Sequence, residues 1–148
     1  MKIAIGADHA GYMLKEELKH WLDEWNIPYH DFGTYSPERV DYPDYGILVA
    51  RAVAKGGFEK GILICGTGIG MSIVANKVKG IRAALCRDPY EAKLSREHND
   101  ANILALGGRI LGFDLAKEIV RVWLNTEFSG GRHKVRIDKI SRIEEDEL

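Results

Sequence analysis

Residues 65–70 read Cys-Gly-Thr-Gly-Ile-Gly, and these residue types at this spacing suit chemistry on an anion. The apolar run 62–64 before them is typical of a short buried strand, and helical spacing of apolar residues begins near Gly70. A glycine turn between a strand and a helix leaves free backbone N–H groups around one point. We therefore predict a pocket for an anion, or for an oxygen that becomes one, with the thiol of Cys65 at its edge.

A plainer interpretation and two nucleotide motifs compete with this one. Cys65 alone is as readily a small buried apolar residue in a tight turn as a reactive thiol. Three glycines in five residues cost more conformational entropy than a plain turn needs, which favours a site. A P-loop requires a lysine that this loop lacks, and a dinucleotide fingerprint requires glycine where Met71 stands. The pocket therefore suits a ligand smaller than a dinucleotide.

Two histidines supply groups that move protons near neutral pH. His9 follows the first predicted strand, and His98 lies between a predicted helix and the last strand. We expect both at the edge of the sheet where ligands bind. Together with the thiol they suit acyl transfer by a nucleophilic Cys65, or proton abstraction beside a carbonyl with the enediolate held by the turn. Proton abstraction with the enediolate held by the turn is what phosphosugar isomerisation needs. His98 would then open the sugar ring.

Strand-like and helix-like segments alternate along the chain, which predicts a parallel sheet with helices on both faces. Residues 35–45, which include Pro37 and Pro43, are interpreted as a loop. The predicted strands are 3–6, 29–32, 62–64, 81–86 and 103–106, and the predicted helices are 12–25, 47–55, a helix from about residue 70, 89–97 and 113–124.

Ligands of such sheets bind beyond the carboxyl ends of the strands, where the strand order reverses. Polar or reactive residues occupy those positions in this sequence. They are Asp8, His9, Gly33, Thr34, residues 65–70, Arg87, Asp88 and residues 107–109.

Length and composition limit the classes of function. The 148 residues predict one domain, 1–148, and a net charge of −1 argues against binding to nucleic acid. No apolar run approaches the roughly 20 residues of a membrane-spanning helix. The N-terminus is strand-like rather than a signal peptide, and neither Cys65 nor Cys86 belongs to a Cys-x-x-Cys pair. We therefore expect a cytoplasmic protein without a disulfide framework or a structural zinc.

The tail, residues 129–148, departs from the alternating pattern. After Gly130 and Gly131 it holds a basic cluster and three isoleucines at helical spacing. A solvated helix with internal ion pairs is the plainer interpretation. A phosphate clamp that an apolar helix carries to a neighbouring subunit is the alternative. The residues concerned are Arg132, His133, Lys134, Arg136, Ile137, Ile140 and Ile143.

Five motifs resemble those of the type B ribose-5-phosphate isomerases, and the similarity covers nearly the whole chain. This family also includes allose- and galactose-6-phosphate isomerases. The motifs are Gly6-Ala7-Asp8-His9-Ala10-Gly11, Asp41-Tyr42-Pro43-Asp44, Cys65-Gly66-Thr67-Gly68-Ile69-Gly70-Met71-Ser72, His98-Asn99-Asp100-Ala101-Asn102 and Gly107-Gly108-Arg109.

The resemblance implies an α/β fold, a Rossmann-like three-layer sandwich with a five-stranded parallel sheet and a C-terminal helical tail. It implies a homodimer or homotetramer with sites at the subunit interface, and neither a cofactor nor a metal. By motif, Cys65 resembles the base that moves a proton between C1 and C2, and Thr67 resembles its polar neighbour. His98 resembles the acid–base group that opens the ring.

The resemblance also implies the substrate contacts. Residues 66–70 match the anion hole for the enediolate, and Asp8 matches a contact to sugar hydroxyls. The phosphate contacts are shared between two subunits. The full set of matched binding residues is Asp8, His9, Gly66, Thr67, Gly68, Ile69, Gly70, Asn99, Arg109, Arg132 and Arg136.

The leading hypothesis is therefore an aldose–ketose isomerase for ribose 5-phosphate and ribulose 5-phosphate, a step of the pentose phosphate pathway. Isomerisation of a six-carbon phosphosugar such as allose 6-phosphate is the alternative within the same chemistry. A nucleotide-binding module without catalysis is the alternative from another class, and the missing lysine and glycine argue against it.

Overall fold

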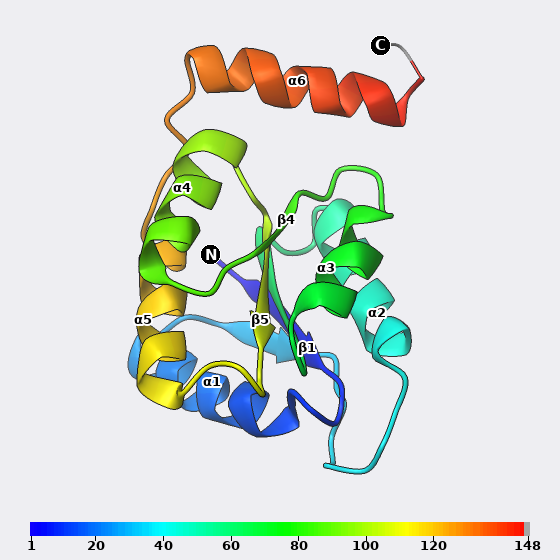
Figure 1. The fold of residues 1–148 in the computed structure, drawn as a ribbon, viewed down its shortest axis with the longest axis vertical. Coiled ribbons are helices and arrows are strands. Elements are labelled where there is room, and N and C mark those ends of the chain that lie inside the picture. The colour runs from blue at the N-terminus through cyan, green and yellow to red at the C-terminus, as the bar shows by residue number, and fades with distance from the viewer. Residues whose placement is uncertain (147–148) are drawn as a thin grey trace.

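All five strands run parallel in one sheet, in the order β2-β1-β3-β5-β4 (Figure 1). This confirms the five-stranded parallel sheet expected from the sequence. The computed structural model describes residues 1–146, so the end of the predicted tail, 147–148, lies outside the described residues. The strands are β1 (Ile3–Ala7), β2 (Tyr29–Asp31), β3 (Lys60–Cys65), β4 (Ala83–Leu85) and β5 (Ile103–Gly107).

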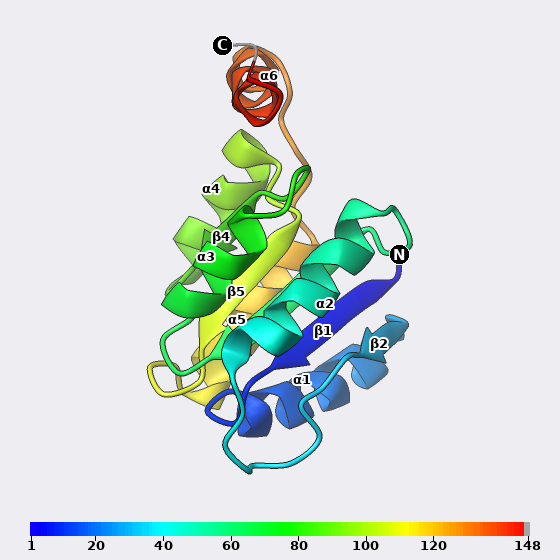
Figure 2. The same cartoon turned by 90° about the vertical axis from the view of Figure 1, so that its right-hand side faces the viewer.

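Helices cover both faces of the sheet and give a three-layer α/β sandwich (Figure 2). One face carries α1 (Tyr12–Glu24), α4 (Pro89–Asn99) and α5 (Phe113–Leu124), and the other carries α2 (Tyr42–Ala54) and α3 (Ile69–Asn76). The tail helix α6 (Arg132–Glu144) lies beyond one end of the sheet (Figures 1 and 2), where it contacts the end of α4 and the loop before β4. Within residues 1–146, no helix is long and apolar enough to cross a membrane.

Successive side chains of each strand point to opposite faces and supply two separate cores. In β3, Ile62 and Ile64 pack with α1, α4 and α5, whereas Leu63 and Cys65 pack with α2 and α3. The strands therefore read as continuous apolar runs, as expected for a sheet buried on both faces. Cys65 ends β3 on the side of α3, the helix that the glycine loop starts.

The boundaries follow the sequence pattern except at α2. The loop prediction for 35–45 is wrong for its last four residues, because α2 begins at Tyr42 rather than at residue 47. Pro43 stands in the first turn of that helix, where its missing N–H removes no helical hydrogen bond. Proline here starts a helix instead of interrupting one.

The strand order places a crevice between β1 and β3. The chain moves outward from β1 to β2 and then returns to β3 on the other side of β1, so the order reverses between these two paired strands. The helices that follow them, α1 and α3, cover opposite faces. Their loops therefore separate at the carboxyl edge, where ligands of such sheets bind.

Gly11 shows how tightly this edge is packed. A Cβ atom at Gly11 would lie 2.6 Å from the carbonyl carbon of Ile64, a backbone atom of β3 that cannot move alone. We expect Gly11→Ala to lower the free energy of unfolding by about 2 to 3 kcal/mol in urea denaturation. Gly57→Ala is the matched control, because the nearest atom to its Cβ would lie 3.8 Å away. Equal losses in the two variants would contradict this account.

Candidate active site

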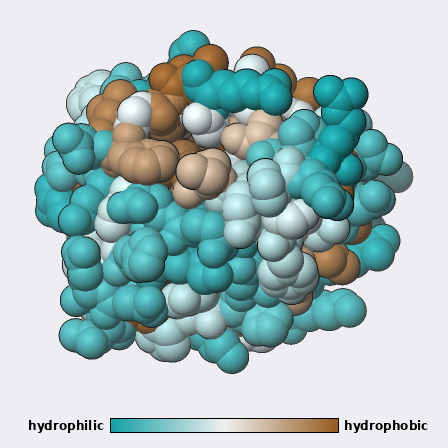
Figure 3. Space-filling view, turned by 90° about the horizontal axis from the view of Figure 1, so that it is seen from below, coloured by the Kyte–Doolittle hydropathy of each residue, from teal (hydrophilic) through white to brown (hydrophobic). Residues whose placement is uncertain are grey.

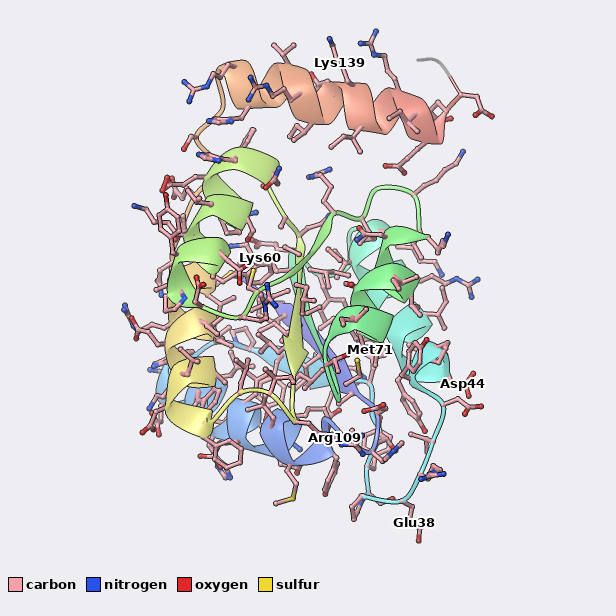
Figure 4. All side chains as sticks on the ribbon, in the orientation of Figure 1. Glu38, Asp44, Lys60, Met71, Arg109 and Lys139 are labelled. Atoms are coloured by element: carbon pink, nitrogen blue, oxygen red, sulfur yellow. The ribbon has the colours of Figure 1, made fainter. Side chains whose placement is uncertain are left out.

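A pocket of about 410 Å³ opens at the carboxyl ends of β1 and β3. It gathers six of the residues expected to bind substrate together with Cys65, and Arg109 marks its place at the lower edge of the sheet in Figure 4. Figure 3 looks onto this edge and shows an apolar patch on a largely hydrophilic face. The pocket is lined by Asp8, Tyr42, Cys65, Gly66, Thr67, Ile69, Gly70, Ile73 and Arg109.

The glycine loop connects β3 directly to α3. Gly68 has a φ of +80°, and a Cβ atom there would lie 2.9 Å from the carbonyl carbon of Leu106, so glycine is required. Thr67 Oγ1 accepts a hydrogen bond of 3.2 Å from the N–H of Ile69, the first residue of α3. The following N–H groups of the first turn are the donors that a helix N-terminus offers to an anion.

Cys65 lies at the pocket wall, although it is only 4% exposed. Its carbonyl oxygen accepts a hydrogen bond of 2.8 Å from Gly108 N, and the Gly66 carbonyl accepts one of 2.9 Å from Arg109 N. These two bonds tie the glycine loop to the loop after β5. They also bring Arg109 over Gly66, where a Cβ atom would lie 3.5 Å from the guanidinium.

Asp8 and His9 follow β1. Asp8 is 5% exposed, and its Oδ1 accepts hydrogen bonds of 3.0 Å from the N–H groups of Ala10 and Gly11. These bonds fix the carboxylate at the pocket. His9 lies next to the pocket rather than in its wall, and its Nδ1 is 3.2 Å from both the N and the O of Val40.

His98 is not where the sequence analysis expected it. It lies in the last turn of α4, which runs back to the amino edge of the sheet. There Arg82, just before β4, donates a hydrogen bond of 2.8 Å to the carbonyl of Asn99. Strands rise about 3.3 Å per residue, so the four residues from Gly61 to Cys65 separate the two edges by roughly 13 Å. The expectation that His98 shares the ligand edge of its own chain is therefore wrong.

The remaining predicted residues form a second cluster around His98. The imidazole of His98 stacks on that of His133, with ring centres 4.3 Å apart and planes inclined by 13°. Burial lowers the pKa of His133, and the positive charges of His98, Arg132 and Arg136 lower it further, against Glu97. The amino-edge cluster therefore comprises His98, Asn99, Arg132, His133 and Arg136.

Two residues of the pocket wall, Tyr42 and Ile73, are not among the site residues predicted from the sequence. The ring of Tyr42 lies 2.8 Å from where a Cβ atom of Gly70 would stand, so the two residues pack directly. The signal for Tyr42 was its place before Pro43 in a matched motif, which the loop interpretation obscured. Ile73 is 55% exposed, and its helical spacing from Ile69 indicates only a helix, not a place in the pocket.

The chain matches the family described as Ribose/Galactose Isomerase over residues 3–140. It belongs to that family. It is 54% identical to ribose-5-phosphate isomerase B of Escherichia coli, over 97% of each chain. A Clostridium thermocellum ribose-5-phosphate isomerase B structure is 57% identical, with a TM-score of 0.98 over 100% of both chains.

A third relative was solved with a ligand. Ribose-5-phosphate isomerase B of Mycoplasma genitalium, with bound ribulose 5-phosphate, is 42% identical to this chain. Its structure superposes with a TM-score of 0.94 over 98% of this chain and 97% of that one.

The stacked pair leads to a titration experiment. Because burial and three positive neighbours favour the neutral imidazole, the pKa of His133 should lie below its ordinary 6.5 in an NMR titration. Arg136→Gln removes one of those charges and should raise that pKa. Lys139→Gln is the control, because Lys139 lies on the outer side of α6 (Figure 4). A His133 that titrates identically in all three proteins would contradict the electrostatic explanation.

Proposed function

We propose that the protein interconverts ribose 5-phosphate and ribulose 5-phosphate through an enediolate, without a metal. The observation that carries the proposal is the thiol of Cys65 in one pocket with the glycine loop that begins α3. Membership of the isomerase family and the ribulose 5-phosphate bound to the Mycoplasma relative support it. The proposed enzyme comprises residues 1–148 as one domain and works in the cytoplasm, in the pentose phosphate pathway.

The proton transfer is assigned to Cys65. Its thiolate takes the proton from C2 of the open-chain aldose, the electron pair forms the C1–C2 double bond, and the carbonyl electrons move to O1. The N–H groups of residues 66–70 hold the negative oxygen, while Thr67 passes the O2 proton toward O1. Return of the first proton to C1 gives the ketose. Asp8 holds the sugar hydroxyls, His9 contacts the phosphate, and Arg109 is a further substrate contact.

The second half of the site is assigned to a partner subunit. His98 would open the ring by taking the proton of the anomeric hydroxyl and giving one to the ring oxygen, yet the sheet separates it from the Cys65 of its own chain. In a symmetric homodimer, or a tetramer built from such dimers, each amino-edge cluster would meet the other chain's pocket. Exposed apolar residues of α6, Val135, Ile140 and Ile143, support such packing, because they are 59%, 43% and 57% exposed. Arg132 and Arg136 would then bind the phosphate, with Asn99 beside them.

The assignment of the base is tested by Cys65→Ala. This variant should lose at least about a hundredfold in kcat for ribose 5-phosphate and stop exchanging the C2 proton with deuterated water. Binding of ribose 5-phosphate, measured by calorimetry, should persist. Cys86→Ala is the control, since burial raises the pKa of the Cys86 thiol to about 11 and keeps that thiol protonated. Turnover unchanged in Cys65→Ala would rule this base out. Allose 6-phosphate, assayed in parallel, tests the six-carbon alternative.

Mixing two inactive variants tests the shared site. Cys65→Ala and His98→Asn should each be inactive alone. A mixed dimer would carry one site with both changes and one with neither, so random exchange of subunits should restore about one quarter of the native activity. The activity of each variant and of the co-refolded mixture is measured at equal protein concentration. A mixture that stays inactive, although mass spectrometry detects mixed dimers, would show that both residues serve the same subunit's site.

A further inference from the structure

Lys15 of α1 is a charged side chain with no exposed surface. Its Nζ lies 2.5 Å from Asp31 Oδ2 and 2.9 Å from Glu16 Oε2. The rings of Tyr12 and Tyr35 lie 5.5 and 5.8 Å from the same nitrogen. A buried ion pair of this kind adds little net stability compared with apolar residues of similar size. Its presence therefore needs an explanation other than the stability of the fold.

The hydrogen bonds of Asp31 lead from Lys15 to the pocket. Asp31 Oδ1 accepts a hydrogen bond of 2.8 Å from Gly33 N. The Gly33 carbonyl then accepts one of 2.7 Å from Ala7 N, and Thr34 N donates one of 2.7 Å to the Ala7 carbonyl. Ala7 is the last residue of β1 and directly precedes Asp8. One oxygen of Asp31 thus meets the buried ammonium, and the other holds the turn that fixes the end of β1.

A second contact, further along the chain, also joins the segment after β2 to the loop after β1. The 33–40 segment that begins at this turn ends at Val40, whose backbone contacts His9 Nδ1 at 3.2 Å. The segment therefore contacts Ala7 at one end and His9 at the other, on either side of Asp8. Two residues further, Tyr42 starts α2 in the pocket wall.

We propose that Lys15 is a positioning residue of the active site, which orients Asp31 so that the 33–34 turn holds Asp8 and His9 toward the substrate. The inference rests on the proposed function, because it assumes that these two residues bind the phosphosugar. Lys15 itself touches no pocket residue through its charged group. It acts through Asp31 and the main chain, and its effect should therefore fall on substrate binding more than on proton transfer.

Lys19 provides a matched comparison within the same cluster. It also lies near Asp31, at 3.3 Å from Oδ2, but its side chain is 29% exposed and its other contact is Glu16. Solvent screens such an exposed pair, and water can replace the lysine. Lys15→Met and Lys19→Met each remove one positive charge beside the same carboxylate. Only the first should raise the KM for ribose 5-phosphate, by roughly tenfold, with a smaller change in kcat.

Two double variants separate positioning from stability. Both remove the buried ion pair, and only the Leu variant also loses the hydrogen bond from Gly33 N, so their urea denaturation is measured beside their KM. Lys15→Met with Asp31→Asn keeps an acceptor oxygen for Gly33 N and should return the KM toward the native value. Lys15→Met with Asp31→Leu lacks that acceptor and should keep the KM raised. A purely structural role predicts the same KM for both. These variants also keep the test valid if Lys15→Met alone fails to fold.

Amide hydrogen exchange supplies a readout that needs no substrate. Exchange at Ala7 N and Thr34 N should quicken in Lys15→Met and in the Leu double variant, but not in Lys19→Met or the Asn double variant. Failure of the native protein to isomerise ribose 5-phosphate would overturn the proposed function. The exchange pattern would still test whether Lys15 orders the 33–34 turn. Equal exchange and equal KM in the Asn and Leu double variants would overturn the role of Lys15.

Discussion

Main-chain contacts around the end of β3 are the interaction on which the rest of this structure depends. The Ile64 carbonyl accepts a hydrogen bond of 3.2 Å from Asp8 N, while the next two carbonyls accept from the loop after β5. A Cβ atom at Gly107 would lie 2.8 Å from the backbone of Thr67, so the segments touch without side chains between them. This contact positions the loop that carries the Cys65 thiol and the N–H groups at the start of α3.

A rigid carboxyl edge also limits what one chain can do. Parallel strands collect their following loops at one edge, whereas each crossover helix returns the chain to the other edge. Residues late in α4 are therefore far from residues late in β3 by construction. An enzyme of this fold that uses both His98 and Cys65 on one sugar must bring them together across two chains. The arginines of α6 then belong to the same half of the site as His98.

The sequence predicts this fold well because its signals are local. Apolar runs ended by glycine mark β3 and β5, and the glycine string after Cys65 marks one wall of the pocket, whose other walls come from Asp8, Tyr42 and Arg109. The start of α2 was missed because Pro43 suits both a loop and a first helical turn. His98 was misplaced for another reason. Its position depends on the direction of α4 relative to the sheet, and the motif that contains it carries no information about which chain it serves.

The placement of charged residues relates this fold to the recognition of a phosphate. With a net charge of −1 the whole chain does not attract a dianionic phosphate, so recognition must come from cations concentrated at one place. Arg109 stands at the pocket, but Arg132 and Arg136 stand on a helix that projects from the other end of the chain. In a single subunit Arg109 therefore lies apart from Arg132 and Arg136, which are neighbours on α6. Under the proposed two-chain arrangement they would converge where substrate phosphate can neutralise them, which would couple assembly to substrate binding.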